Sequence, residues 1–347
     1  PYASIKKTEL YELGFDDDRI RWLSQPHIPT SVIEDITWNH DKAHQILAIF
    51  CNKIDGEELW RFAPAVTGSK MIEQADLTDL CAPEALPRIK KVLEDYWSNR
   101  TLIEIAKNKY VPLWTYGQST SWGSLNEKEK EALTECFEEL NKKNEKLWKK
   151  QADEIFEAIT KAVKMIPCGE DLGVNIECVP KTMDAHKILG LRVVRWCREW
   201  SKEGQPYVPF ADYTPLSVTT TSVHDSSTLR QWWDDEKESV KAFLKENAEN
   251  FGDENKTEET ANSPFTPEIA EKVLQASSTS ASQWFIPPLQ DFLYMDKSLW
   301  LDNSADERIN VPGTVTNFNW TYRLPCTLED LCKNQELINK IKKISSR

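Results

Sequence analysis

Four short apolar segments separated by helical patterns limit the fold of this chain more than any other feature. The segments expected as strands span residues 165–168, 191–196, 217–223 and 284–286. Strands that alternate with helices along a chain typically lie parallel in one sheet. The sequence therefore predicts an α/β fold for this region.

The intervening segments carry helix signals. A helix is expected from about Pro180 to Leu189, ended by Gly190. Another carries Leu229, and a third begins at Pro267 behind the N-cap Thr266. The acidic stretch 250–262 is predicted to be a mobile linker.

Polar residues follow three of the expected strands. They are the pairs Glu170–Asp171, His224–Asp225 and Gln290–Asp291. Parallel strands present such residues at one edge of the sheet, where active sites of barrel enzymes lie. Glu170 and Asp225 are expected on strands with one further strand between them, so that both face one ligand. Paired carboxylates suit glycosidic chemistry, but acidic strand ends also bind metals or pair with arginines.

Residues 1–160 have a different pattern. Short irregular elements fill the first 80 residues, and apolar residues at helical spacing predict a helix over 83–99. Ser124 and Glu127 match a capping box, and the helical period behind them continues to Val163. We expect the Lys and Glu residues of this long helix to form solvated faces.

Composition excludes several classes of protein. The 347 residues carry a net charge of −13, which opposes binding to nucleic acid. No apolar run approaches the ~18 residues of a membrane span, and no secretory leader is visible. Fourteen tryptophans are compatible with sugar stacking, although core filling by large rings is the more common reason.

The cysteines and histidines do not suggest a metal site. Eight cysteines lack the C-x-x-C spacing, which favours reduced thiols in a cytoplasmic protein. His40 and His44 share a helix face but have no H-E-x-x-H carboxylate between them, so we interpret them as ordinary histidines. We expect neither a metal nor an organic cofactor.

An ordered set of motifs resembles a known family. Glu170-Asp-Leu-Gly173 is followed by Leu-Gly-Leu-Arg-Val, by a segment around His224-Asp225, by Pro288-Leu-Gln-Asp291, by Arg308-Ile-Asn-Val-Pro-Gly313 and by Asn319-Trp-Thr-Tyr-Arg323. This set resembles the 4-α-glucanotransferases of glycoside hydrolase family 77, the amylomaltases or disproportionating enzymes. The plant-type cytosolic branch, which also occurs in gut bacteria, is the more similar one. The resemblance is specific from about 160 to 340 and looser before it.

The resemblance implies a fold and an activity. Residues 161–347 would form the C-terminal half of a TIM (β/α)8-type barrel, and residues 1–160 a mostly helical insertion region. Glu170 matches the general acid/base, and Asp225 matches the carboxylate that binds the sugar hydroxyls. The residues implied to bind an α-1,4-glucan or maltodextrin are His224, Asp171, Gln290, Asp291, Asn319 and Trp320. Without the motif, Glu170 would be interpreted as an ion-pair partner and His224 as a core histidine.

One departure from the family pattern concerns the nucleophile. The family places it in an Arg-x-Asp-His stretch, which does not occur in this sequence, and residues 1–15 resemble a segment C-terminal to that stretch in family members. We therefore expect a C-terminal part of the enzyme, inactive without an N-terminal part that supplies the nucleophile. A non-catalytic carbohydrate-binding module with a degenerate barrel is the alternative. A related α-amylase-type hydrolase, which would release glucose without redistributing chains, is the third.

Overall fold

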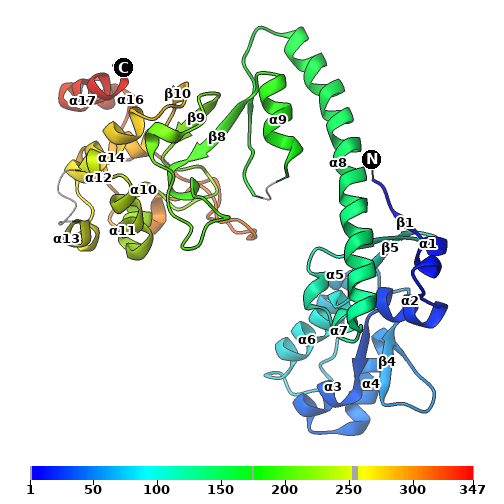
Figure 1. Ribbon diagram of the computed structural model, residues 1–347. Helices are drawn as coiled ribbons and strands as arrows, with labels where there is room; N and C mark the ends of the chain where they lie inside the picture. The colour runs from blue at the N-terminus through cyan, green and yellow to red at the C-terminus, as the bar shows by residue number, and fades with distance from the viewer. Residues whose placement is uncertain (1, 174–175, 252–256, 347) are drawn as a thin grey trace. The chain divides into compact units, whose positions relative to one another are not determined.

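The computed structural model describes residues 2–173, 176–251 and 257–346, which form two compact units. Unit 1 spans Pro1–Trp148 and unit 2 spans Lys149–Arg347. The division falls within one long helix, α8 (Glu127–Ala162), drawn in green in Figure 1. Each unit has its own hydrophobic core, so each is described by itself.

Unit 1 contains two three-stranded antiparallel sheets that the sequence did not predict. One has the order β1 (Ile5–Lys6), β6 (Lys109–Pro112), β5 (Leu102–Ala106), and the other β2 (His27–Pro29), β4 (Leu59–Phe62), β3 (Cys51–Lys53). The helices are α1 (Lys7–Glu12), α2 (Asp17–Ser24), α3 (Thr30–Thr37), α4 (His40–Phe50), α5 (Ser69–Glu73), α6 (Leu86–Ser98) and α7 (Thr120–Gly123). Two separate clusters of buried apolar residues hold these elements together.

Helix α8 begins with a reciprocal cap different from the predicted one. The Asn126 side chain accepts a hydrogen bond from the Glu129 amide, and the Glu129 carboxylate accepts one from the Asn126 amide. The predicted Ser124–Glu127 box is wrong, because the Ser124 hydroxyl instead donates to the Ser121 carbonyl. Asn is as effective an N-cap as Ser, so two overlapping signals competed here.

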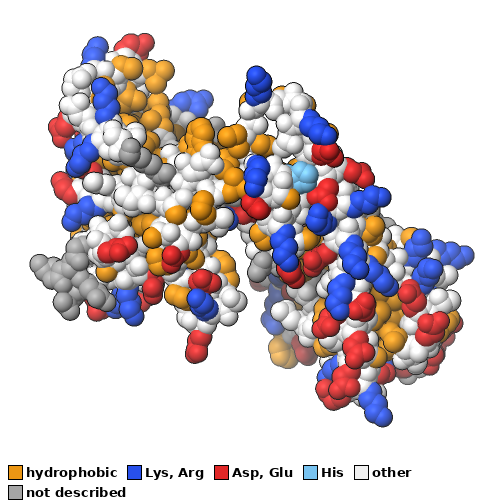
Figure 2. All heavy atoms as spheres, turned by 45° about the horizontal axis from the view of Figure 1, so that its top comes forward, with side chains coloured by type: hydrophobic (Ala, Val, Ile, Leu, Met, Phe, Trp, Pro, Cys, Tyr) orange, Lys and Arg blue, Asp and Glu red, His pale blue; other side chains and the backbone are white. Residues whose placement is uncertain are grey.

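The charged faces of α8 carry ion pairs between successive turns. Lys149 pairs with Asp153 and Lys161 with Glu157, each over four residues. Figure 2 shows basic and acidic side chains interspersed over the visible surface rather than gathered into one patch of a single sign. Such pairs stabilise a helix only slightly.

Unit 2 is built on a four-stranded parallel sheet, which confirms the predicted α/β class. The strand order is β10 (Trp284–Phe285), β9 (Ser217–Thr220), β8 (Leu189–Val193), β7 (Cys168–Gly169), and every pairing is parallel. The helices are α9 (Cys178–Ala185), α10 (Leu229–Asp235), α11 (Lys237–Glu246), α12 (Ala248–Phe251), α13 (Thr257–Asn262), α14 (Pro267–Ser278), α15 (Leu289–Leu293), α16 (Leu328–Leu331) and α17 (Gln335–Ser345). An aromatic-rich cluster that includes Trp232 and Trp233 forms the core.

Two of the expected features of unit 2 fall around helices α13 and α14. Thr266 caps α14 by accepting a hydrogen bond from the Ile269 amide, as predicted. The linker expected over 250–262 lies partly outside the described residues, and its described end forms α13. Within the described part of the chain, no helix has the length and apolar character needed to cross a membrane.

Candidate active site

Two of the three predicted polar pairs lie beyond the carboxyl ends of strands of the parallel sheet, and the third, Gln290–Asp291, lies within helix α15. Glu170 directly follows β7 and is exposed, and Asp225 lies beyond the end of β9. Strand β8 pairs with both β7 and β9, so the expected strand order is confirmed. That Glu170 and Asp225 face one ligand stays a prediction. Carboxyl ends of parallel strands are where ligands bind in α/β folds.

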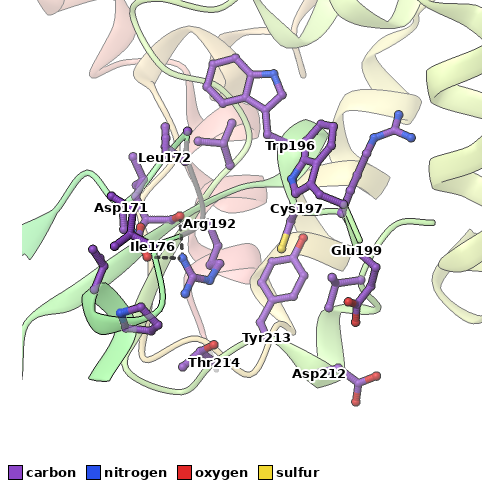
Figure 3. Close-up of a pocket in the computed structure, with 18 residues that line it drawn as sticks. Asp171, Leu172, Ile176, Arg192, Trp196, Cys197, Glu199, Asp212, Tyr213 and Thr214 are labelled. Atoms are coloured by element: carbon purple, nitrogen blue, oxygen red, sulfur yellow. Dashed lines mark hydrogen bonds and ion pairs between the residues drawn. The ribbon is translucent and has the colours of Figure 1, made fainter. Parts of the chain in front are cut away.

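Asp171 ties the end of β7 to β8. One carboxylate oxygen accepts a hydrogen bond from the Leu191 amide at 2.7 Å, and the other pairs with the Arg192 guanidinium at 2.9 Å. Figure 3 shows this ion pair beside a cavity. Both oxygens thus have partners within the protein. Pairing with an arginine is one of the alternatives that the sequence left open for acidic residues at strand ends. A contact of Asp171 with substrate stays a prediction.

The same contact explains an error of the sequence analysis at Gly190. Helix α9 ends at Ala185, and Gly190 lies inside β8 instead of ending a helix. A Cβ atom at this position would lie 2.7 Å from the Asp171 carboxylate. The glycine therefore permits the close approach of the carboxylate rather than a left-handed helix end.

A large cavity of unit 2 opens beside Asp171 and Arg192. It measures about 710 Å³, and its walls include Trp196, Trp200 and Tyr213. Figure 3 shows Trp196 and Tyr213 among the lining side chains. Trp200 is 59% exposed, while Tyr213 is buried and burial raises the pKa of its hydroxyl. Large aromatic faces next to charged groups are able to bind sugar rings.

His224 and Asp225 lie in a cluster completed by the segment beyond residue 308. The Asn310 amide nitrogen donates to the Asp225 carboxylate at 2.6 Å, and His224 Nε2 lies 3.4 Å from the other Asp225 oxygen. The Trp320 ring centroid is 5.3 Å from that of His224. Asn319 accepts a hydrogen bond from the Val311 amide and so shapes the segment.

Asp291 and Gln290 lie next to this cluster. Asp291 is fully buried, and its carboxylate accepts hydrogen bonds from the Thr221 and Ser222 hydroxyls, which lie just before His224. Burial raises the pKa of Asp291. Both residues line a small cavity of about 160 Å³ together with His224. Asp291 acts here on the shape of the loop, and a direct contact of either residue with substrate stays a prediction.

Arg195 is a neighbouring residue that the sequence analysis did not select. Its side chain is 4% exposed, donates to the Ser227 hydroxyl and lies over the Trp232 ring at 5.3 Å. Its Nε and Nη2 atoms have no hydrogen-bond partner, and burial lowers its pKa to about 10. An arginine inside an apolar strand was the available signal, because such a residue is rarely buried without a role.

The arrangement has the groups that carbohydrate recognition needs. Asp225 accepts hydrogen bonds, and His224 donates or accepts according to its tautomer. Trp320 is 62% exposed and offers an apolar face beside them. Together they match the hydroxyls and the C–H face of a sugar ring.

The chain is similar to known 4-alpha-glucanotransferases over part of its length. A 4-alpha-glucanotransferase of Chlamydia pneumoniae is 37% identical over 205 residues, which cover 58% of this chain and 36% of that protein. The 4-alpha-glucanotransferase DPE2 of Oryza sativa subsp. japonica is 28% identical over 260 residues, 74% of this chain and 26% of that protein. A solved amylomaltase from Streptococcus agalactiae in complex with acarbose aligns with a TM-score of 0.41 and 23% identity, over 56% of this chain and 34% of that one.

The family assignment rests on a family model that matches more than half of the chain. The chain spans about a third of the length of the two Chlamydia relatives, from C. pneumoniae and C. muridarum. The model of glycoside hydrolase family 77, described as 4-alpha-glucanotransferase, matches residues 59–328. That match covers both acidic strand ends and the segment through Trp320. The chain therefore belongs to the 4-alpha-glucanotransferase family, glycoside hydrolase family 77.

Proposed function

We propose that this chain carries the acid/base side of a retaining 4-α-glucanotransferase active site. The observation that supports it most is the position of Glu170 and Asp225 at the carboxyl ends of β7 and β9, parallel strands joined by β8. Glu170 serves as the general acid/base. Asp225 and His224 bind the hydroxyls of the sugar whose bond is broken.

The proposed reaction proceeds in two displacements. A carboxylate attacks the anomeric carbon of an α-1,4-glucan while Glu170 gives its proton to the departing 4-oxygen. Glu170 then takes the proton of an incoming 4-hydroxyl, whose oxygen displaces the carboxylate. Asp225 stabilises the positive charge that develops on the sugar ring in both steps. Transfer exceeds hydrolysis when bound sugar excludes water, which aromatic faces such as Trp320 favour.

The nucleophile is proposed to come from residues outside 1–347. The sequence contains no Arg-x-Asp-His stretch, and the chain spans about a third of its relatives. In this proposal residues 161–347 complete a (β/α)8 barrel with an N-terminal part, and residues 1–160 are an insertion. The eight cysteines lack the C-x-x-C spacing, and on that ground we place the protein in a reducing, cytoplasmic location.

A carbohydrate-binding module without catalysis is the second candidate. The absent Arg-x-Asp-His stretch favours it, and the His224–Asp225–Trp320 cluster is able to bind a sugar by itself. The sequence upstream of Pro1 separates the two candidates. An Arg-x-Asp-His stretch within a few tens of residues supports the transferase, and its absence supports the binding module.

Titration of the chain with maltotriose by calorimetry tests the glucan site. We expect Asp225→Asn and Trp320→Ala each to weaken binding about tenfold, because each removes one direct contact worth ~1–2 kcal/mol. Glu170→Gln should change the affinity less than about twofold, since a general acid acts mainly on the transition state.

The matched controls are exposed residues elsewhere. Trp114, 77% exposed, and Asp184 give the variants Trp114→Ala and Asp184→Asn, which should bind as the parent does. Equal affinities for Trp320→Ala, Asp225→Asn and the controls would show that the glucan binds elsewhere or not at all.

A further inference from the structure

A second cluster of chemically active side chains lies in unit 1. His40 and His44 of α4 face Glu58, which precedes β4, and one ligand atom from each lies within 4.8 Å of the others. His44 Nε2 is 2.7 Å from Glu58 Oε2, and His40 Nε2 is 3.9 Å from the same oxygen. Two imidazole nitrogens and one carboxylate oxygen thus converge on one place.

The local fold holds these three groups in position. Asn39 caps α4, so the two histidines lie on its first two turns with ring centroids 4.4 Å apart. The buried Thr30 hydroxyl donates to Glu58 Oε2 at 2.6 Å and accepts from Trp60 Nε1 at 2.8 Å. The Thr30 amide also donates to the Glu58 carbonyl. Glu58 is therefore fixed at both its backbone and its side chain.

A further carboxylate orients one of the histidines. Glu34 Oε2 lies 2.9 Å from His40 Nδ1, and this contact directs the opposite nitrogen, Nε2, toward Glu58. Histidines that bind metal usually donate their other ring N–H to a carboxylate in this way. Lys53 pairs with Oε1 of Glu58, so an ion would bind Oε2 beside the Thr30 hydroxyl and take the place of the His44 contact.

We propose that His40, His44 and Glu58 form a binding site for a divalent transition-metal ion of the zinc type. Two imidazoles and one carboxylate are a common zinc ligand set, with water in the fourth position. Bonds of 2.0–2.1 Å at tetrahedral angles separate ligand atoms by roughly 3.3 Å. The His44–Glu58 contact therefore opens slightly when the ion enters.

The site is accessible, and its consequence is structural. The side chains of His40, His44 and Glu58 are 49%, 28% and 52% exposed, so an ion enters from solvent without unfolding of the unit. A bound ion would link the start of α4 to the β3–β4 hairpin. It would also replace contacts between exposed charges, which contribute little to stability, with coordination bonds.

Cobalt titration of the full chain tests this site. We expect a single equivalent of Co²⁺ to bind with weak visible absorption bands and without the strong near-ultraviolet absorption of thiolate ligands. His40→Gln, His44→Gln and Glu58→Gln should each weaken binding at least ~100-fold. Glu34→Gln positions His40 less well and should weaken it about 10–100-fold while the visible bands persist.

The control is a histidine paired with a carboxylate in the other unit. His186 contacts Asp153 at 3.0 Å, and His186→Gln should bind Co²⁺ as the parent does. Zn²⁺ should raise the melting temperature of the parent. Glu58→Gln should still unfold in a cooperative transition, which shows that it folds, and Zn²⁺ should leave its melting temperature unchanged, which shows that it lacks the site. Thiolate absorption, equal affinity in the ligand variants, or no uptake even at millimolar Co²⁺ would overturn the proposal.

Discussion

The two units differ in how completely their buried polar groups are paired. In unit 1 the fully buried Thr101 hydroxyl lies 2.9 Å from Ser119 Oγ and 2.8 Å from Ser121 Oγ. In unit 2 the buried Arg195 and the half-buried Arg308 have buried donor atoms without a partner. Among the described residues, every buried side-chain nitrogen or oxygen without a hydrogen-bond partner belongs to unit 2.

This difference indicates that unit 2 keeps buried polar groups that lower its stability. A buried donor without an acceptor costs about 1–3 kcal/mol, so such groups are kept where a function or a further partner uses them. In unit 2 such atoms include those of Arg195 beyond β8, of Trp232 in α10 and of Arg308. The others belong to Arg230, Gln231, Asn247 and Asp291. In unit 1 the buried side-chain polar atoms of residues 2–148 all have partners, and its proposed metal site lies on its surface.

The largest expected effect is on the rate of catalysis. A substitution at the proposed site in unit 2 should lower this rate, and a substitution in unit 1 should not. In a protein that joins this chain to an upstream Arg-x-Asp-His segment, Glu170→Gln should lower the rate of glucan transfer about 10²–10⁴-fold, because the general acid is lost. Steady-state transfer from maltotriose measures this effect. Glu84→Gln, an exposed residue of unit 1, is the control and should leave the rate unchanged. A similar loss in both variants would show that Glu170 has no special role.

The second prediction tests whether the cores are independent. Trp233→Ala should destabilise unit 2 by about 3–5 kcal/mol, and Leu47→Ala should destabilise unit 1 by about 2–5 kcal/mol, because both side chains are fully buried. Hydrogen exchange measured along a urea titration reports each unit separately. Each variant should lower the midpoint of its own unit, and a common shift of both midpoints would contradict separate cores.

The third prediction is a pair of opposite pH dependences. Burial and the Arg61 charge lower the pKa of His27 in unit 1 to about 4. The unfolded chain binds this proton near pH 6.5, so unit 1 should lose stability as the pH falls from about 6.5 to 4. In unit 2 the raised pKa of Asp291 acts in the other direction. Its contribution is complete below about pH 4 and is lost as the pH rises toward the folded-state pKa.

Thermal unfolding of the two units between pH 4 and 6.5 measures these slopes. His27→Phe keeps a ring beside Trp22, which lies 4.7 Å away, and should flatten the slope of unit 1 only. Asp291→Asn should flatten the slope of unit 2 only. Slopes of the same sign, or slopes unchanged by the variants, would contradict the burial effects described here.

The parallel sheet was predictable because its signals are local. The apolar segments that become β7 to β10 are bounded by polar residues, and Thr266 with Pro267 is a direct helix start. The antiparallel strands of unit 1 are as short as those of the parallel sheet, and they were missed because no regular alternation of strands and helices marks them and their pairing depends on partners elsewhere in the chain. Strands of that length carry too few residues for a period of two to be visible.

The site was predictable only where its motif is contiguous. His224 and Asp225 are adjacent in sequence, whereas Asn310 reaches Asp225 across 85 residues and only the fold brings them together. Asp171 and Asp291 were selected as acidic strand-end residues, but their carboxylates contact Arg192 and the loop hydroxyls. Glu58, 14 residues beyond His44, was missed because a hairpin supplies it.

One measurement tests most directly whether unit 2 is a glucan site that needs a nucleophile from elsewhere. Saturation-transfer difference NMR of maltotriose with the 347-residue chain reports binding, and later spectra of the same sample report products. We predict saturation transfer to the sugar protons, weaker for Asp225→Asn at the same sugar concentration, and no anomeric signals of glucose or longer maltodextrins. No saturation transfer would contradict the glucan site, and robust product formation would show that the nucleophile lies within this chain.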